Sequence, residues 1–161
     1  MAAGTEIMTD SPLELQPNEQ EILAQDVPAF ARTLKDPASR ERYALLAEAV
    51  ETGSVPAELH GPLETMLELA LQTKAIRNRH GPDAERALAD LYFRTGRGAA
   101  QRQAARDVTR ALEALVGQTI EKIAVTAGPG RHTIAINTDR AHLTLSVDRG
   151  GVRVDRVEVG G

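Results

Sequence analysis

The chain has 161 residues and a formal net charge of −4, with 42% hydrophobic and 26% charged residues and no cysteine. This composition is that of one globular domain or of two small subdomains. It excludes disulfides, thiolate nucleophiles and cysteine-bound zinc or iron–sulfur clusters. No apolar run approaches the roughly 20 residues of a membrane-spanning helix, and the N-terminus lacks a secretory signal. We therefore expect a soluble, cytoplasmic protein with no membrane partner.

The charges are unevenly distributed along the chain. Residues 1–73 carry 4 Lys and Arg against 13 Asp and Glu, residues 74–110 carry 9 against 4, and residues 111–161 carry 6 against 6. A basic block beside an acidic block indicates either a functional patch or neighbouring helices that pair their charges. We favour internal pairing.

The first signals along the chain predict a tail and then helices. Residues 1–16 show little periodicity and predict a mobile N-terminal tail, and helical signals follow over residues 17–116. Asn18 followed by Glu21 fits an N-cap with a returning carboxylate. Pro28 lacks an N–H and should break or kink this first helix.

Capping signals delimit the next helices. Asp36 followed by Pro37 predicts a helix start, and Gly53 predicts its end. The motif His-Gly-Pro-Asp at residues 80–83 closes one helix and opens another, which ends near residues 95–98. A last helix is predicted over about residues 99–116.

The helix predicted over residues 62–78 is apolar on two sides. One broad face carries Leu63, Met66, Leu67, Ala70 and Leu71, whereas Leu69 and Ile76 fall on nearly the opposite side. Such a helix is either central in the bundle or meets another chain. Leu69 and Ile76 are therefore candidate partner-binding residues.

Beyond Gly117 the period changes to two, which predicts four strands with short turns. Closing the hairpins on the pairs 128/131, 137/140 and 148/151 places the aliphatic residues of all four strands on one face. The middle closure sets Ile134 opposite Leu143. We predict an α+β fold, with an N-terminal four- to five-helix bundle followed by a four-stranded antiparallel meander packed on the helices. Residues 117–161 would share a core with the last helix.

Two further features of the meander follow from its pattern. The apolar positions of the last strand change parity after Val154, which predicts a β-bulge at Asp155 and Arg156. The second face of the sheet should be flat, with small or weakly polar side chains. Either water or a partner protein covers it, and its candidate partner-binding residues are Thr126, Thr133, Ala135, His142, Thr144 and Ser146.

Five arginines and no lysine lie between residues 94 and 110. Arg102, Arg106 and Arg110 fall opposite Val108 on a helical wheel, as expected of the wet face of an amphipathic helix. The alternative is an anion site formed by Arg94, Arg97, Arg102, Arg106 and Arg110, because backbone N–H groups at a helix N-terminus favour anions. We favour the solvated face.

Signals for chemistry are weak. The segment Ala127–His132 contains Gly-Pro-Gly between two strands, where a turn explains it better than a phosphate loop. The four histidines show no spacing for a metal site, and no carboxylate pair or nucleophile elbow indicates catalysis. We name no catalytic residue, metal ligand or cofactor, and the chain is more consistent with a non-enzyme.

Three functions remain open, in this order. The first is a non-catalytic protein–protein interaction module, such as an adaptor, an assembly factor or a small subunit, whose partner is another protein or a second copy. The second is a nucleic-acid or polyanion-binding module that uses the arginine-rich helix. The third is an enzyme or small-molecule binder with a site between bundle and sheet.

Overall fold

The computed structural model describes residues 11–160 and divides the chain into two compact units. Unit 1 extends to Ala99 and unit 2 begins at Ala100, so the boundary falls inside helix α6. Helices are followed by a four-stranded antiparallel sheet, which confirms the predicted α+β class. The last helix is thus grouped with the sheet rather than with the other helices. Within residues 11–160, none of the helices is both long and apolar enough to cross a membrane.

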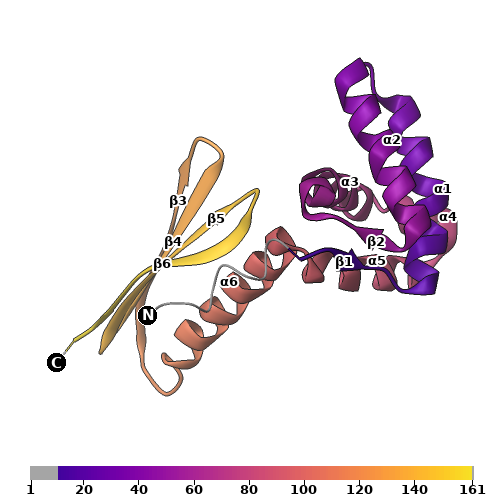
Figure 1. Ribbon diagram of the computed structural model, residues 1–161. Helices are drawn as coiled ribbons and strands as arrows, with labels where there is room; N and C mark the ends of the chain where they lie inside the picture. The colour runs from indigo at the N-terminus through magenta and orange to yellow at the C-terminus, as the bar shows by residue number, and fades with distance from the viewer. Residues whose placement is uncertain (1–10, 161) are drawn as a thin grey trace, which may run out of the picture. The chain divides into compact units, whose positions relative to one another are not determined.

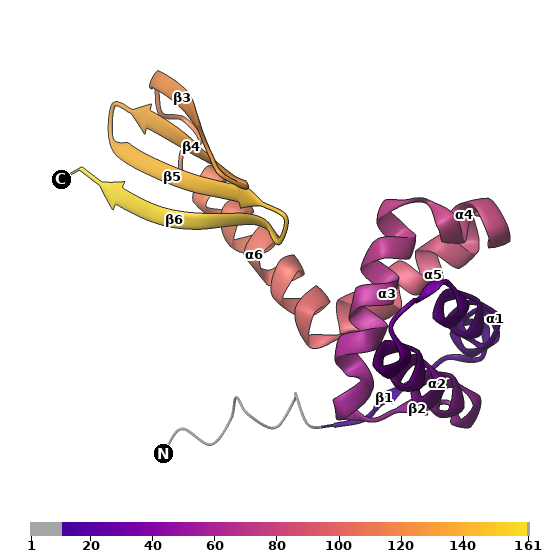
Figure 2. The same cartoon turned by 90° about the horizontal axis from the view of Figure 1, so that it is seen from above.

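The elements of unit 1 are shown in Figure 1 and, from above, in Figure 2. They are, in chain order, β1 (Leu13–Glu14), α1 (Pro17–Thr33), α2 (Pro37–Thr52), β2 (Ser54–Val55), the 3-10 helix η1 (Ala57–Leu59), α3 (His60–Gln72), α4 (Ala75–His80) and α5 (Pro82–Arg94). Helix α6 (Gly96–Glu113) begins in unit 1 and continues into unit 2. Unit 2 adds β3 (Ile120–Gly128), β4 (Arg131–Thr138), β5 (Ala141–Asp148) and β6 (Gly151–Val159).

Regular structure begins earlier than the sequence predicts. Residues 1–10 of the expected mobile tail lie outside the described residues. In the remainder, Leu13 and Glu14 pair antiparallel with Val55 and Ser54, and Leu13 and Leu15 pack against the core of unit 1. These leucines bury apolar surface, which gives the segment a reason to be ordered.

Helix α1 differs from its prediction both at its N-cap and at Pro28. Its N-cap is Gln16 rather than Asn18, and Glu19 closes the capping box by accepting from the Gln16 N–H at 2.8 Å. The helix continues through Pro28 as one element. Packing of Leu23 and Val27, both fully buried, stabilises the helix beyond the hydrogen bond that the proline removes.

Helix α2 begins and ends as predicted. The Asp36 carboxylate accepts from the Ser39 N–H at 2.9 Å and from its hydroxyl at 2.7 Å, and these bonds lower the pKa of Asp36. Gly53 ends the helix with φ of 81°, in the left-handed region where a side chain would be strained.

The single helix predicted over residues 62–78 is two helices. Lys74, with φ of 61°, separates α3 from α4. This break changes the direction in which α4 presents its side chains, and Ile76 is fully buried in the core of unit 1. A partner therefore has no access to Ile76, although Leu69 stays 48% exposed.

Helices α1 to α5 enclose the core of unit 1. Its fully buried side chains include Leu23, Leu46, Leu63, Leu67, Ile76, Leu88 and Leu91. All four aromatic residues of the chain belong to unit 1: the ring of Phe30 meets that of Tyr43 edge-on at 4.9 Å between centroids, and Tyr92 lies beside Phe93.

The sheet of unit 2 has the order β3-β4-β5-β6, as a meander. The first and last predicted registers are confirmed by the pairs Val125↔Ile134 and Leu145↔Val154. The middle register is wrong by two residues, because Ile134 pairs with Leu145 rather than with Leu143. A shift of two keeps each side chain on its face, so the aliphatic face survives the error.

Both outer strands contain an irregularity. In β6, Thr144 pairs with Arg156 and Leu145 with Val154, which leaves Asp155 as the extra residue and confirms the predicted bulge. In β3, the register shifts between Ile120 and Lys122. The shift in β3 places Ile120 on the aliphatic face, as the bulge in β6 does for Val157.

Helix α6 covers the middle of the aliphatic face. Val108, Leu143 and Leu145 are its buried core, and Leu115 and Ile134 pack against them. Figures 1 and 2 both show α6 running along one face of the sheet. A helix about 10 Å wide spans about two strands that lie about 4.8 Å apart. One helix therefore leaves the aliphatic residues of β3 and of the second half of β6 exposed, whereas Val152 and Val154 in the first half of β6 pack against this core.

Candidate functional site

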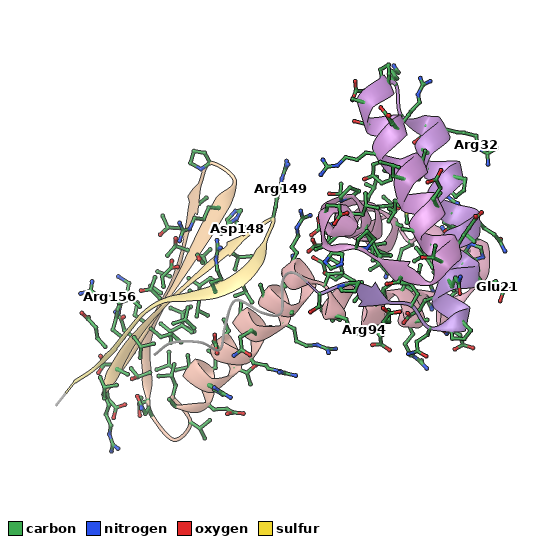
Figure 3. The ribbon with its side chains drawn as sticks, viewed as in Figure 1. Glu21, Arg32, Arg94, Asp148, Arg149 and Arg156 are labelled. Atoms are coloured by element: carbon green, nitrogen blue, oxygen red, sulfur yellow. The ribbon has the colours of Figure 1, made fainter. Side chains whose placement is uncertain are left out.

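The candidate anion site at residues 94–97 is occupied by the chain's own carboxylates. Arg94, at the end of α5 (Figure 3), contacts Glu19 at 2.5 Å between Nη2 and Oε2. Glu19 is 4% exposed. A guanidinium bound to a buried carboxylate is already neutralised. Arg94 is therefore no longer a candidate for binding an external anion.

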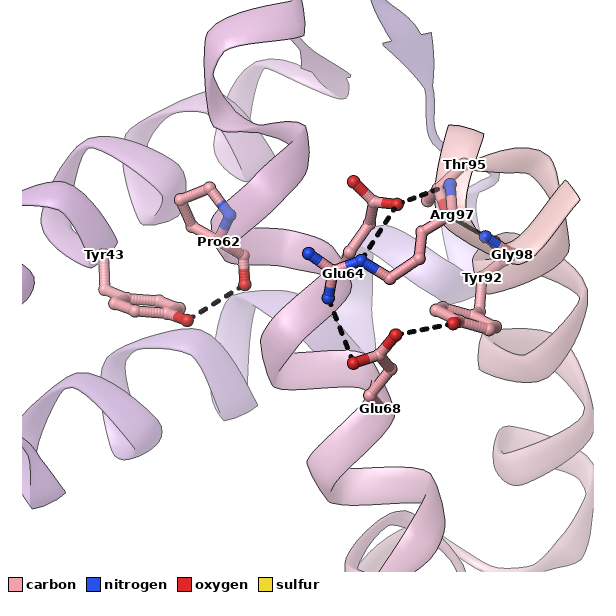
Figure 4. Close-up of polar contacts among 8 residues, drawn as sticks. All are labelled: Tyr43, Pro62, Glu64, Glu68, Tyr92, Thr95, Arg97 and Gly98. Carbon is pink, nitrogen blue, oxygen red and sulfur yellow. Dashed lines mark hydrogen bonds and ion pairs between the residues drawn. The ribbon is translucent and has the colours of Figure 1, made fainter. Parts of the chain in front are cut away.

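Arg97 bridges two acidic side chains of α3 (Figure 4). Its Nη1 lies 3.0 Å from Glu68 Oε2, and its backbone N–H donates to Glu64 Oε2 at 2.7 Å. Glu64 thus occupies the N-terminal end of α6, where the alternative interpretation of the sequence would place an external anion. The Tyr92 hydroxyl donates to Glu68 at 2.7 Å, and burial and this hydrogen bond raise the pKa of Tyr92.

Thr95 joins the two helices at this junction (Figure 4). Its hydroxyl donates to the Tyr92 carbonyl at 2.6 Å and accepts from the Gly98 N–H at 3.2 Å. Thr95 therefore caps the N-terminus of α6 while it satisfies a carbonyl at the end of α5. The sequence Thr-Gly-Arg-Gly at residues 95–98 is a helix junction, and its arginine is structural.

The other three arginines of the stretch lie on α6 within unit 2. Arg102, Arg106 and Arg110 are exposed at intervals of four residues, whereas Val108 on the other side is 7% exposed. They therefore lie on the wet face of α6. Within residues 11–160, Arg106 and Arg110 form no ion pair with a carboxylate.

The second face of the sheet is tied together by its own polar side chains. The His142 ring contacts the Asn137 side-chain oxygen through Nδ1 and the Thr144 hydroxyl through Nε2. Ser146, predicted to meet a partner, is 1% exposed. Its hydroxyl donates to the bulge residue Asp155 at 2.9 Å, so the bulge that turns Asp155 toward this face removes Ser146 from the surface.

The remaining predicted residues of that face stay accessible to different extents. Thr126, on β3, is exposed, and Thr133, Ala135, His142 and Thr144 are partly buried. Of the candidate residues on this face, Thr126 on the outer strand β3 is therefore the most accessible.

Leu69 lies beside an apolar hollow of about 270 Å³ in unit 1. Phe30, Met66 and Ala70 also line it, and Asp26 and Arg79 lie at its rim. Asp26 is held by His80 Nε2 at 2.8 Å and by Arg79 Nη1 at 3.2 Å. The two charged residues among those that line this hollow thus pair with one another. The hydroxyls of its two threonines, Thr33 and Thr73, donate to backbone carbonyls.

The histidines do not gather. His60 Nε2 contacts the Val55 carbonyl at 2.9 Å, and His80 contacts Asp26. In the part of the chain that the structure describes, no three histidine or carboxylate side chains come close enough together to hold a metal ion.

The most exposed apolar residues lie in unit 2, and the periodicity of the sequence does not single them out. Among residues 11–160, nine large hydrophobic residues are exposed, of which seven belong to unit 2: Leu112, Val116, Ile120, Ile123, Val125, Val157 and Val159. We call the five on the outer strands (120, 123, 125, 157 and 159) the aliphatic margins. Comparing the width of one helix with that of four strands would have predicted them.

Comparison of the chain with protein-family models, with curated proteins and with solved structures finds no match in any of the three.

Proposed function

We propose that the protein is a non-catalytic protein–protein interaction module, an adaptor, assembly factor or small subunit, which associates through the aliphatic margins of unit 2. The observation that carries this proposal is the exposure of Ile123 and Val125 on β3, 57% and 65%, and of Val159 on β6, 77%. Scattered exposed aliphatics are common on monomers, whereas a concentration along two strand edges is typical of an interaction surface.

The margins carry enough apolar surface to matter energetically. Burying an aliphatic side chain fully is worth about 1.5–3 kcal/mol, so covering the exposed part of Ile123 or Val125 contributes about 1–2 kcal/mol each. A change of 1.4 kcal/mol is about tenfold in affinity. Losing both residues should therefore weaken a complex by about 30-fold or more.

Lysine substitutions in the margins test the proposal. Ile123→Lys with Val125→Lys removes apolar surface and adds charge, and Leu45→Lys is the control, because Leu45 is 50% exposed in unit 1. Light scattering after size-exclusion chromatography measures the mass of the full chain, alone and with any protein that copurifies in fixed stoichiometry. We expect a complex, with itself or with another protein, that the double variant loses and the control keeps.

The proposal fails if the wild-type chain is a monomer and forms no stoichiometric complex with any protein of its source. It also fails if a complex forms and the double variant retains it at wild-type affinity. Far-ultraviolet circular dichroism on each variant establishes that the fold is intact.

A second candidate function, polyanion binding, is favoured by one observation. Arg102, Arg106 and Arg110 are three exposed residues on one face of α6. Three phosphate contacts predict a slope of about −2.7 in the logarithm of affinity against the logarithm of salt concentration. Arg106→Gln with Arg110→Gln should reduce that slope, and absence of binding to duplex DNA at low salt would eliminate this candidate.

A further inference from the structure

The two edges of the sheet in unit 2 differ in how well they are protected. In β6, the bulge at Asp155 interrupts the strand near its middle. Arg156 projects from this strand (Figure 3), and Arg153 and Glu158 add further charges. A bulge and alternating charges are the usual devices that prevent an edge strand from pairing with another chain.

Strand β3 has its irregularity at its start. From Lys122 to Gly128 it pairs with β4 without interruption, and Lys122 is the one charged residue in that run. Strand order makes β3 an outer strand, so every second residue directs its backbone N–H and C=O away from β4. From Lys122 to Gly128, the outer edge of β3 is therefore a regular, nearly uncharged template for another strand.

We propose that a second copy of this chain covers this edge, with its own β3 antiparallel to the first and a two-fold axis at Ala124. The two sheets then form one continuous eight-stranded sheet. This inference depends on the proposed function, because it names the partner of the β3 margin.

The sequence of β3 is complementary to itself in this arrangement. Ala124 is the midpoint of Ile120–Gly128, so a two-fold axis there gives the longest overlap of the two strands. Ile123 then lies opposite Val125 of the second copy, and Val125 opposite its Ile123. Cross-strand pairs of β-branched residues stabilise a sheet, and the two margins merge into one aliphatic surface.

The charges and the second face also fit a second copy. Lys122 lies opposite Thr126 of the second copy, about four residues from the other Lys122, so like charges do not oppose each other. Ala124 meets Ala124 on the other face, where small side chains leave room. Isologous two-fold contacts of this kind are the commonest in homo-oligomers.

Single cysteines test the axis, because the chain contains none of its own. Two Ala124→Cys thiols would lie directly opposite, with Cα atoms about 4.5–5.5 Å apart, inside the range that a disulfide spans. Two Thr126→Cys thiols would be four residues apart along the strand, roughly 13 Å. Under mild oxidation we expect a covalent dimer of A124C and none of T126C. Crosslinking of both alike, or of neither, would overturn the proposed pairing.

Sedimentation equilibrium of the full chain provides the second measurement. We expect a dimer that Ile123→Lys with Val125→Lys weakens at least 30-fold and that Val157→Lys, on the opposite margin, leaves intact. A wild-type monomer at tens of micromolar overturns the inference. In that case the proposed function still stands if the β3 double variant loses a complex with a different protein, and it falls as well if no complex depends on these residues.

Discussion

Replacing Gly98 by alanine places one methyl group against the backbone where α5 meets α6. A Cβ on Gly98 would lie 1.9 Å from the carbonyl oxygen of Tyr92 and 2.9 Å from the Cα of Phe93. That carbonyl oxygen is fixed, because it accepts from the N–H of Thr95 at 3.0 Å and from its hydroxyl at 2.6 Å. Only a displacement of the backbone can relieve the clash.

The cost follows from the contacts that such a displacement breaks. Overpacking costs about 1–3 kcal/mol, and each hydrogen bond lost from the junction adds about 0.5–1.5 kcal/mol. The bonds at risk are those that Gly98 donates to Thr95 and that Arg97 donates to Glu64. Alanine recovers about 0.5–1 kcal/mol through its lower backbone entropy in the unfolded chain. We expect Gly98→Ala to lower the free energy of unfolding by about 2–4 kcal/mol.

Urea titration followed by far-ultraviolet circular dichroism measures this loss. Gly96→Ala is the matched control, since a Cβ on Gly96 meets nothing within 4 Å, and it should leave the stability unchanged or raise it by about 0.5 kcal/mol. If the Gly98 variant unfolds at the same urea concentration as the Gly96 variant, the junction is not packed as described.

Three other predictions concern stability and titration. Leu143→Ala opens a cavity in the small core of unit 2, where Leu143 is fully buried, and should lower the free energy of unfolding by about 2–5 kcal/mol; an unchanged urea midpoint would contradict that packing. The hydrogen bonds from Ser39 hold the pKa of Asp36 below 3.8, so the stability that its carboxylate contributes is present above that pH and lost as the pH falls through the folded-state pKa. The deficit of Asp36→Ala should therefore shrink from neutral to acidic pH, and a constant deficit would refute the capping role. Burial raises the pKa of both Tyr43 and Tyr92 above 10.0. The stability that their neutral hydroxyls contribute is therefore present below pH 10.0 and lost as the pH rises through the folded-state pKa values. At pH 10.0, the tyrosinate absorbance of the folded chain should stay below half of the value that the unfolded chain shows.

The sheet was predictable because alternation carries most of its information. The parity change between Val154 and Val157 located the bulge at Asp155. Alternation could not detect the two-residue error in the middle hairpin, because an even shift leaves every side chain on the same face. There the turn decides: the Thr138 hydroxyl accepts from the N–H of Ala141 at 2.8 Å, which fixes Asp139 and Arg140 as the two loop residues.

The break between α3 and α4 had no local signal. A lysine in the left-handed region is disfavoured by about 1–2 kcal/mol, and neither glycine nor asparagine occupies position 74 to announce it. Packing of α4 against the core outweighs that cost, and Ile76 is buried as a result. Tertiary contacts that overrule local preference cannot be predicted from a periodic pattern.

The arginines likewise differ in whether local sequence or tertiary contacts determine their roles. Arg94 and Arg97 find carboxylates 75 and 29 residues away in sequence, at Glu19 and Glu68, and no spacing rule connects such positions. The opposite charges of residues 1–73 and 74–110 did indicate internal pairing, and these bonds confirm it for the two arginines. A helical wheel was sufficient to predict the exposure of Arg106, because that exposure depends only on the face of α6 on which the residue lies.

All four aromatic rings belong to unit 1, which gives the molecule a natural spectroscopic division. Intrinsic tyrosine fluorescence reports on unit 1 alone, whereas the amide signal of the backbone reports on both units. A denaturation curve recorded with both probes will therefore separate the unfolding of unit 1 from that of unit 2, without any label. Coincident curves would mean that the halves of the chain unfold together through the helix they share.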